Sequence, residues 1–123
     1  MLNIHIRTVP HEAQRYDTCG DWQYTKSGAL TITVSDLGNW RMEVAVAIHE
    51  LIECLLCRND GVTTQQVDEF DMSYKGKGEP GDEPSAPYAS QHSVATGVER
   101  IMTALLGVKW REYETVVDGL RRT

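Results

Sequence analysis

The sequence predicts an α+β fold in which a small N-terminal sheet, antiparallel or mixed, packs against later helices. In the N-terminal third, apolar and polar residues alternate with the two-residue period of a strand. In the remainder, apolar residues recur with the period of about 3.6 residues that is typical of a helix. A chain that runs from strands to helices in this way is typical of α+β proteins. Its length of 123 residues fits a single domain, residues 1–123, with one core.

Three strands are expected in the first part of the chain. Alternating apolar residues over residues 2–7 indicate a half-buried strand. A loop over residues 8–21 follows, and strands at residues 22–25 and 29–34 come after it. Because the short turn between them contains Gly28, which tolerates positive φ, these two strands are expected to form a hairpin.

Four helices are expected after the strands. The first covers residues 40–57 and ends before Asn59-Asp-Gly61, and a short one begins with a capping box at Thr63. A long helix covers residues 89–106, and an amphipathic one covers residues 110–122. The positions expected to face the core share a helical spacing, and they are Val44, Ile48, Leu51, Ile52 and Leu55 on the first helix and Val94, Val98, Ile101 and Leu105 on the long helix.

Residues 75–87 are rich in glycine, proline and acidic side chains, so they are expected to form an irregular and mobile loop. A loop of this length serves either as a lid over a site or as slack at the surface.

Composition excludes several function classes. The net charge of −6 argues against a nucleic-acid partner, because phosphate binding requires a concentrated basic surface. No apolar run approaches the roughly 20 residues that cross a bilayer, so no membrane partner is expected, and the N-terminus lacks a signal-peptide core. Three cysteines suit a reducing compartment, which predicts a cytoplasmic protein, and Cys54 and Cys57 are interpreted as packed thiols. Oligomeric state has no signal in the sequence.

A histidine and two glutamates interrupt the apolar segment over residues 45–53, where burial would be costly without a compensating partner. With His49 at 0° on a helix, Glu53 falls at about 40° and Glu50 at about 100°. All three side chains therefore share one face. His49 and Glu53, one turn apart, can bind one cation, and Glu50 can hold a water beside it.

The later helix offers a third ligand. His92, Ala95 and Glu99 share one of its faces, and the small Ala95 permits a close approach to the first helix. His92 and Glu99 are about 10.5 Å apart along the axis, so both are not expected to bind one ion directly. We expect His92 to be the ligand because imidazole suits zinc, whereas Glu99 is expected to support the site or to form an ion pair.

The segments Leu30-Thr-Ile-Thr-Val-Ser35 and Val46-Ala-Ile-His-Glu-Leu51 resemble the strand and helix of a zincin-type metallopeptidase, and residues 89–107 are similar to the downstream helix of compact zincins. The resemblance implies zinc-dependent hydrolysis of a peptide or protein substrate, with an edge strand aligning the peptide. It implies His49, Glu53 and His92 as metal ligands and Glu50 as the general base that activates a metal-bound water. Glu53 replaces the second histidine of HExxH, which makes the site more anionic and admits other divalent transition metals.

The whole chain also resembles small uncharacterised proteins of bacteriophages and prophages, which would place it in a bacterial host cytosol. Two other functions stay open. Glu50, Glu53, Asp68 and Asp71 form an ExxE…DxxD pattern that resembles the Mg²⁺-dependent nucleotide pyrophosphohydrolases of all-α fold. Alternatively, the chain is a non-catalytic phage protein that binds a host factor through the acidic residues 79–84.

For the hydrolase hypothesis, Tyr74 and Tyr88 are candidates for hydrogen-bonding a developing oxyanion.

Overall fold

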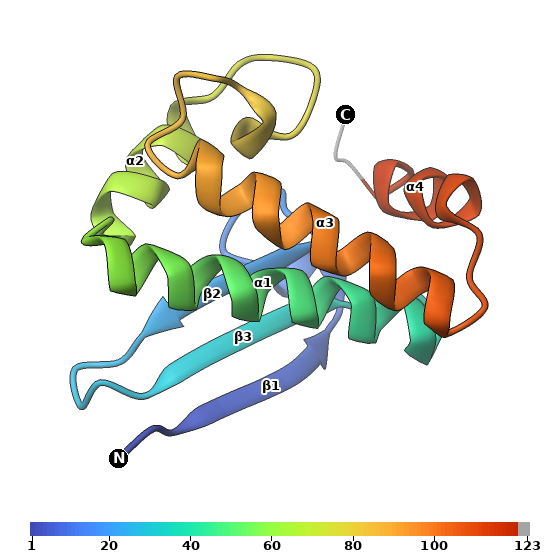
Figure 1. The fold of residues 1–123 in the computed structure, drawn as a ribbon, viewed down its shortest axis with the longest axis horizontal. Helices are drawn as coiled ribbons and strands as arrows, with labels where there is room; N and C mark the ends of the chain where they lie inside the picture. The colour runs from blue at the N-terminus through green and yellow to red at the C-terminus, as the bar shows by residue number, and fades with distance from the viewer. Residues whose placement is uncertain (121–123) are drawn as a thin grey trace.

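The computed structural model describes residues 1–120, and it has the α+β organisation predicted from the sequence (Figure 1). Its strands are β1 (Ile4–Val9), β2 (Gly20–Tyr24) and β3 (Leu30–Ser35). Its α-helices are α1 (Trp40–Asp60), α2 (Thr64–Ser73), α3 (Ala89–Leu105) and α4 (Trp110–Asp118). Two short 3-10 turns complete this part of the chain, η1 (His11–Ala13) and η2 (Pro80–Asp82).

The sheet is mixed, with the strand order β1-β3-β2. β1 runs parallel to β3, and β2 runs antiparallel to it, so that Ile6 and Trp22 both pair with Ile32. The predicted β2–β3 hairpin is confirmed, and Gly28 in its turn has φ of +88°. However, β3 is the central strand. The edge-strand role that the zincin resemblance implies for residues 30–35 is therefore wrong, because both sides of β3 are already paired.

The core lies between the sheet and α1. Leu30, Ile32 and Val34 alternate along β3 on the face that α1 covers, and each is at most 1% exposed. Burying side chains of this size contributes about 1.5–3 kcal/mol each. α3 lies beside α1 and runs antiparallel to it (Figure 1). α1 is thus packed on one side by the sheet and on another by α3.

Local signals set the ends of α1. The side chain of Asn39 accepts hydrogen bonds from the backbone N–H groups of Arg41 and Met42 at 3.0 and 3.3 Å, which makes it the N-cap. The helix continues one turn beyond the predicted end at residue 57, because Gly61, with φ of +76°, supplies the left-handed cap.

The predicted core stripe on α3 is wrong, and the one on α1 is borne out only in part, because Leu51 and Leu55 pack against the core. On α3, Val94, Ile101 and Leu105 are 53%, 61% and 76% exposed, and the most buried residues are His92, Ala95 and Thr103. On α1, the expected stripe at Val44, Ile48, Leu51, Ile52 and Leu55 is half-buried, and the fully buried face carries His49, Glu50 and Glu53. His49, Glu53 and His92 face inward because they hydrogen-bond to one another there, and on α1 they share the buried face with apolar residues such as Met42 and Val46.

Other boundaries also differ from the predictions. The predicted loop at 8–21 is shorter, because β1 extends to Val9, η1 follows, and β2 begins at Gly20. Within the predicted irregular loop at 75–87, η2 packs against α2 and α3. α4 ends at Asp118, and the last two residues of the predicted 110–122 helix lie outside the described part of the chain. Within residues 1–120, no helix combines the length and apolar character required to cross a membrane.

Candidate metal centre

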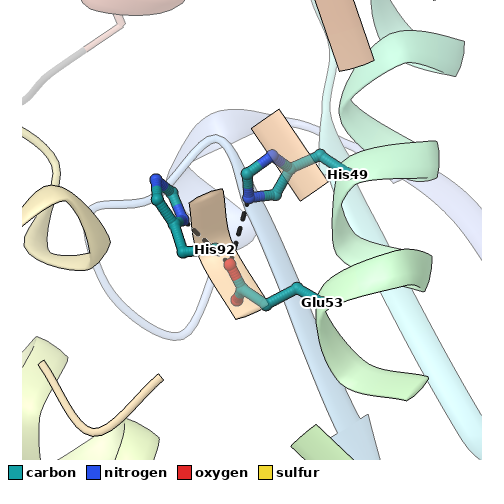
Figure 2. Close-up of side chains that lie close together, drawn as sticks. All are labelled: His49, Glu53 and His92. Atoms are coloured by element: carbon teal, nitrogen blue, oxygen red, sulfur yellow. Dashed lines mark hydrogen bonds and ion pairs between the residues drawn. The ribbon is translucent and has the colours of Figure 1, made fainter. Parts of the chain in front are cut away.

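Three predicted ligands meet at one point between α1 and α3. Glu53 Oε2 lies 3.1 Å from His49 Nε2 and 2.9 Å from His92 Nδ1. The two imidazole rings have centroids 4.7 Å apart, and Figure 2 shows both rings turned toward the Glu53 carboxylate. One potential ligand atom from each residue lies within 4.8 Å of the others. The predicted convergence of these two remote segments is therefore present in the structure.

Helix geometry and close packing set these positions. His49 and Glu53 are one turn apart on α1, so their side chains project from the same face. His92 lies in the first turn of α3, where Ala95 is fully buried and lets the helices approach closely. Gly81 in η2 packs against the imidazole of His92, and a Cβ there would lie 2.5 Å from the ring. The three converging side chains are all at least 90% buried.

Each imidazole also has a carboxylate on its far side. His49 Nδ1 donates to Glu99 Oε1 at 2.7 Å, and the Tyr113 hydroxyl donates to the other oxygen of Glu99. His92 Nε2 lies 3.0 Å from Asp82 Oδ1 and 3.3 Å from Glu79 Oε2. Carboxylates placed behind histidines in this way fix ring orientation and raise basicity at metal sites.

Without a cation, this cluster is a network of buried charges. Burial disfavours charge on Glu53, but hydrogen bonds from the two histidines lower its pKa to about 2. Burial likewise opposes protonation of His92, yet its bonds to Glu53 and Glu79 raise its pKa to about 10. For His49, burial is again outweighed by hydrogen bonds to Glu53 and Glu99, and the pKa rises well above the ordinary value. A bound cation would replace the protons that face Glu53.

The donor set fits a divalent transition metal. Two imidazole nitrogens and one carboxylate oxygen provide three ligands, the number that catalytic zinc sites use before water fills the open position. The same set of two histidines and one carboxylate also suits iron(II) and related ions. The nitrogens that face Glu53, Nε2 of His49 and Nδ1 of His92, are the ones that would coordinate it.

Glu50 lies on the sheet side of α1. Its side chain packs against Gly20 in β2 and is buried, and within residues 1–120 no group donates a hydrogen bond to its carboxylate. Burial, together with the negative charge of Glu53, raises the pKa of Glu50 well above its ordinary value. The structure thus places the carboxyl group of Glu50 against β2, on the helix that carries His49 and Glu53.

A cavity of about 410 Å³ opens onto the site and is lined by His49, Glu53 and His92. Glu50 is not among the described residues that line it. Three of the lining residues come from β2, namely Gly20, Asp21 and Trp22, and Trp22 Nε1 donates to Glu53 Oε1 at 3.1 Å. The edge strand beside the cavity is therefore β2.

The two predicted oxyanion donors line this cavity, but their hydroxyls are engaged. Tyr88 donates to Asp71, and Tyr74 donates to Glu83 at 3.3 Å. Tyr16 donates to the second oxygen of Asp71 at 2.9 Å. Any role of Tyr74 or Tyr88 toward an oxyanion would require these hydrogen bonds to be exchanged.

The ExxE…DxxD pattern does not form a shared site in residues 1–120. Asp68 pairs with Arg15 at 3.1 Å, and Asp71 accepts from two tyrosines. The described groupings that could hold a metal are His49, Glu53 and His92, and Glu79, Asp82 and His92; neither contains Asp68 or Asp71.

Sequence reasoning missed Tyr113, Asp82 and Gly81. Tyr113 was expected only as an apolar position of the last helix, and Asp82 only as part of an acidic loop. Local periodicity carries no information about the hydrogen bonds that these residues make with partners on other elements.

Comparison with protein-family models, curated proteins and solved structures gave no match to this chain.

Proposed function

We propose that this chain is a zinc-dependent hydrolase of zincin type that cleaves an amide bond in a peptide or protein. His49, Glu53 and His92 would hold the metal, and Glu50 would act as the general base. The observation that carries this proposal is the meeting of His49 Nε2, Glu53 Oε2 and His92 Nδ1 around one point, each histidine backed by a further carboxylate.

Burial of this cluster supports a functional role over a purely structural one. Buried ion networks usually stabilise a fold no better than well-packed apolar side chains of similar volume. Here they occupy the interface between α1 and α3, while Val94, Ile101 and Leu105 of α3 remain exposed. Burying these polar side chains while Val94, Ile101 and Leu105 stay exposed brings no evident gain in stability. A function that needs the buried polar groups explains the arrangement.

The chain's own residues have separate tasks in this proposal. A bound zinc ion would supply Lewis acidity toward water and a carbonyl oxygen. Glu50, which accepts no hydrogen bond within residues 1–120, would take a proton, and it would ionise more readily beside a divalent cation. β2 borders the cavity with Asp21 and Trp22, which makes it the strand against which a peptide would lie.

Zinc titration of metal-free protein tests the proposal. We expect one zinc ion per chain, loss of binding in His49→Ala, and unchanged binding in His5→Ala, which removes an exposed histidine of β1. Glu50→Gln should retain zinc but lose hydrolysis of a peptide library. Equal zinc affinity of His49→Ala and His5→Ala would refute the ligand assignment, and full hydrolysis by Glu50→Gln would refute the assigned base.

A further inference from the structure

The hydrogen-bond chain behind His49 leads to the C-terminal helix, and we propose that Glu99 and Tyr113 are positioning residues that present Nε2 of His49 to the metal. This inference rests on the proposed function, because it concerns a ligand of the same site. Both residues would act through the histidine, since Glu99 lies behind the ring and Tyr113 lies behind Glu99.

The geometry holds Glu99 in one orientation. Its Oε1 accepts from His49 Nδ1 at 2.7 Å, and its Oε2 accepts from the Tyr113 hydroxyl. The Glu99 side chain is only 12% exposed, and Tyr113 is 2% exposed. With both oxygens engaged and little access to water, the carboxylate is held between His49 and Tyr113.

The consequence for His49 follows from imidazole chemistry. A histidine binds a metal through the nitrogen that carries no proton, and the hydrogen bond at the other nitrogen decides which one that is. Glu99 would retain the proton on Nδ1, so Nε2, which faces Glu53 and His92, is the nitrogen that would give up its proton to a metal. The negative charge of Glu99 also makes Nε2 of His49 more basic, which makes it a stronger metal ligand.

Tyr113 lies on α4, so its hydrogen bond to Glu99 depends on how α4 packs against α3. The ring of Tyr113 packs on Trp110 with centroids 5.3 Å apart, and the guanidinium of Arg100 on α3 lies 4.7 Å from the Trp110 ring. The contact between Arg100 and Trp110 joins the first turn of α4 to α3. A hydroxyl from the last described helix thereby fixes the carboxylate that orients a ligand on α1.

Zinc affinity of conservative variants tests the inference, with a competing chelating dye as the readout and circular dichroism to confirm folding. Glu99→Gln and Tyr113→Phe keep the shape of each side chain. Tyr16→Phe is the matched control, because it removes a hydroxyl that lines the same cavity but binds Asp71. We expect zinc binding to weaken by about tenfold or more in Glu99→Gln, by about threefold to tenfold in Tyr113→Phe, and by less than about twofold in Tyr16→Phe.

A second measurement needs no variant. In the zinc-loaded wild type, long-range ¹H–¹⁵N correlation spectra should show His49 with a protonated Nδ1 and a metal-bound Nε2. Zinc on Nδ1, or a zinc affinity of Glu99→Gln equal to that of Tyr16→Phe, would overturn the positioning role and leave the proposed function intact. A wild type that binds no zinc would overturn both.

Discussion

The backbone of Gly81 lies against the imidazole of His92, and a Cβ at Gly81 would fall 2.5 Å from His92 Nδ1, the atom that faces Glu53. Contacts this short force one group to move. Because η2 packs on α3, we expect Gly81→Ala to displace the ring of His92 and to weaken zinc binding by about tenfold.

Gly78→Ala is the matched control for that variant. Its added Cβ would meet only the hydroxyl of Tyr74, at 4.0 Å, which is an ordinary contact. Isothermal titration calorimetry should therefore give Gly78→Ala the zinc affinity of the wild type. If the two alanine variants bound zinc equally well, His92 would not be held by Gly81 in the way described.

Replacing Glu53 should change the pH dependence of stability in the metal-free protein. Glu53 contributes to the raised pKa values of His49 and His92. Its contribution through His92 is fully present below the unfolded histidine pKa of 6.5 and is lost as pH rises through about 10. We expect Glu53→Gln to lower the free energy of unfolding by about 3 kcal/mol at pH 6. Urea denaturation of both proteins at pH 6 and pH 10 measures the loss of unfolding free energy. An equal loss at the two pH values would contradict the ion pairs of Glu53 with His49 and His92.

Asp71 provides a second pH test, away from the proposed ligands. Burial raises its pKa to about 6, even though Tyr88 and Tyr16 donate hydrogen bonds to it. The folded chain thus binds this proton more tightly, and the resulting stability is fully present below pH 3.8 and lost as pH rises through 6. Between pH 4 and pH 7, the unfolding free energy of wild type should fall by about 2 kcal/mol relative to Asp71→Asn. If the unfolding free energies of wild type and Asp71→Asn changed in parallel with pH, burial would not raise the pKa of Asp71.

The packing of Glu50 on β2 predicts that Gly20 tolerates no side chain. A Cβ there would lie 2.5 Å from Glu50 Oε1 and 2.8 Å from Val46 Cγ1. We expect Gly20→Ala to destabilise the fold by about 1–3 kcal/mol. Gly97→Ala, which meets nothing within 4 Å in the middle of α3, should instead stabilise it by up to about 1 kcal/mol. Thermal unfolding of the two variants measures whether each is less or more stable than the wild type. If Gly20→Ala were as stable as the wild type, the Glu50 side chain would not pack against Gly20.

The sequence predicted the elements well, and it predicted the pairing of His49 with Glu53, because both depend on local signals. The fold class and the hairpin with its glycine turn follow from neighbours in the chain. The face shared by His49 and Glu53 follows from helix geometry alone. The convergence of His92 on that face required only that a small residue, Ala95, allow the helices to approach.

Two features could not be read from the sequence. Hydrophobicity ranks Val94, Ile101 and Leu105 above His92 and Thr103, so periodicity predicted the wrong buried face for α3. Mutual hydrogen bonding removes the usual cost of burying polar groups, and that compensation appears only in three dimensions. The contact of Tyr113 with Glu99 likewise depends on how α4 docks on α3.

X-ray absorption spectroscopy of the zinc-loaded protein tests the central claim most directly. Two imidazole nitrogens at about 2.0–2.1 Å, with oxygen ligands completing the shell, are the result that the site predicts. The single substitution His92→Ala should then remove one imidazole from the spectrum. Zinc bound by sulfur from Cys54 and Cys57, or by oxygen atoms alone, would contradict a metal centre formed by His49, Glu53 and His92.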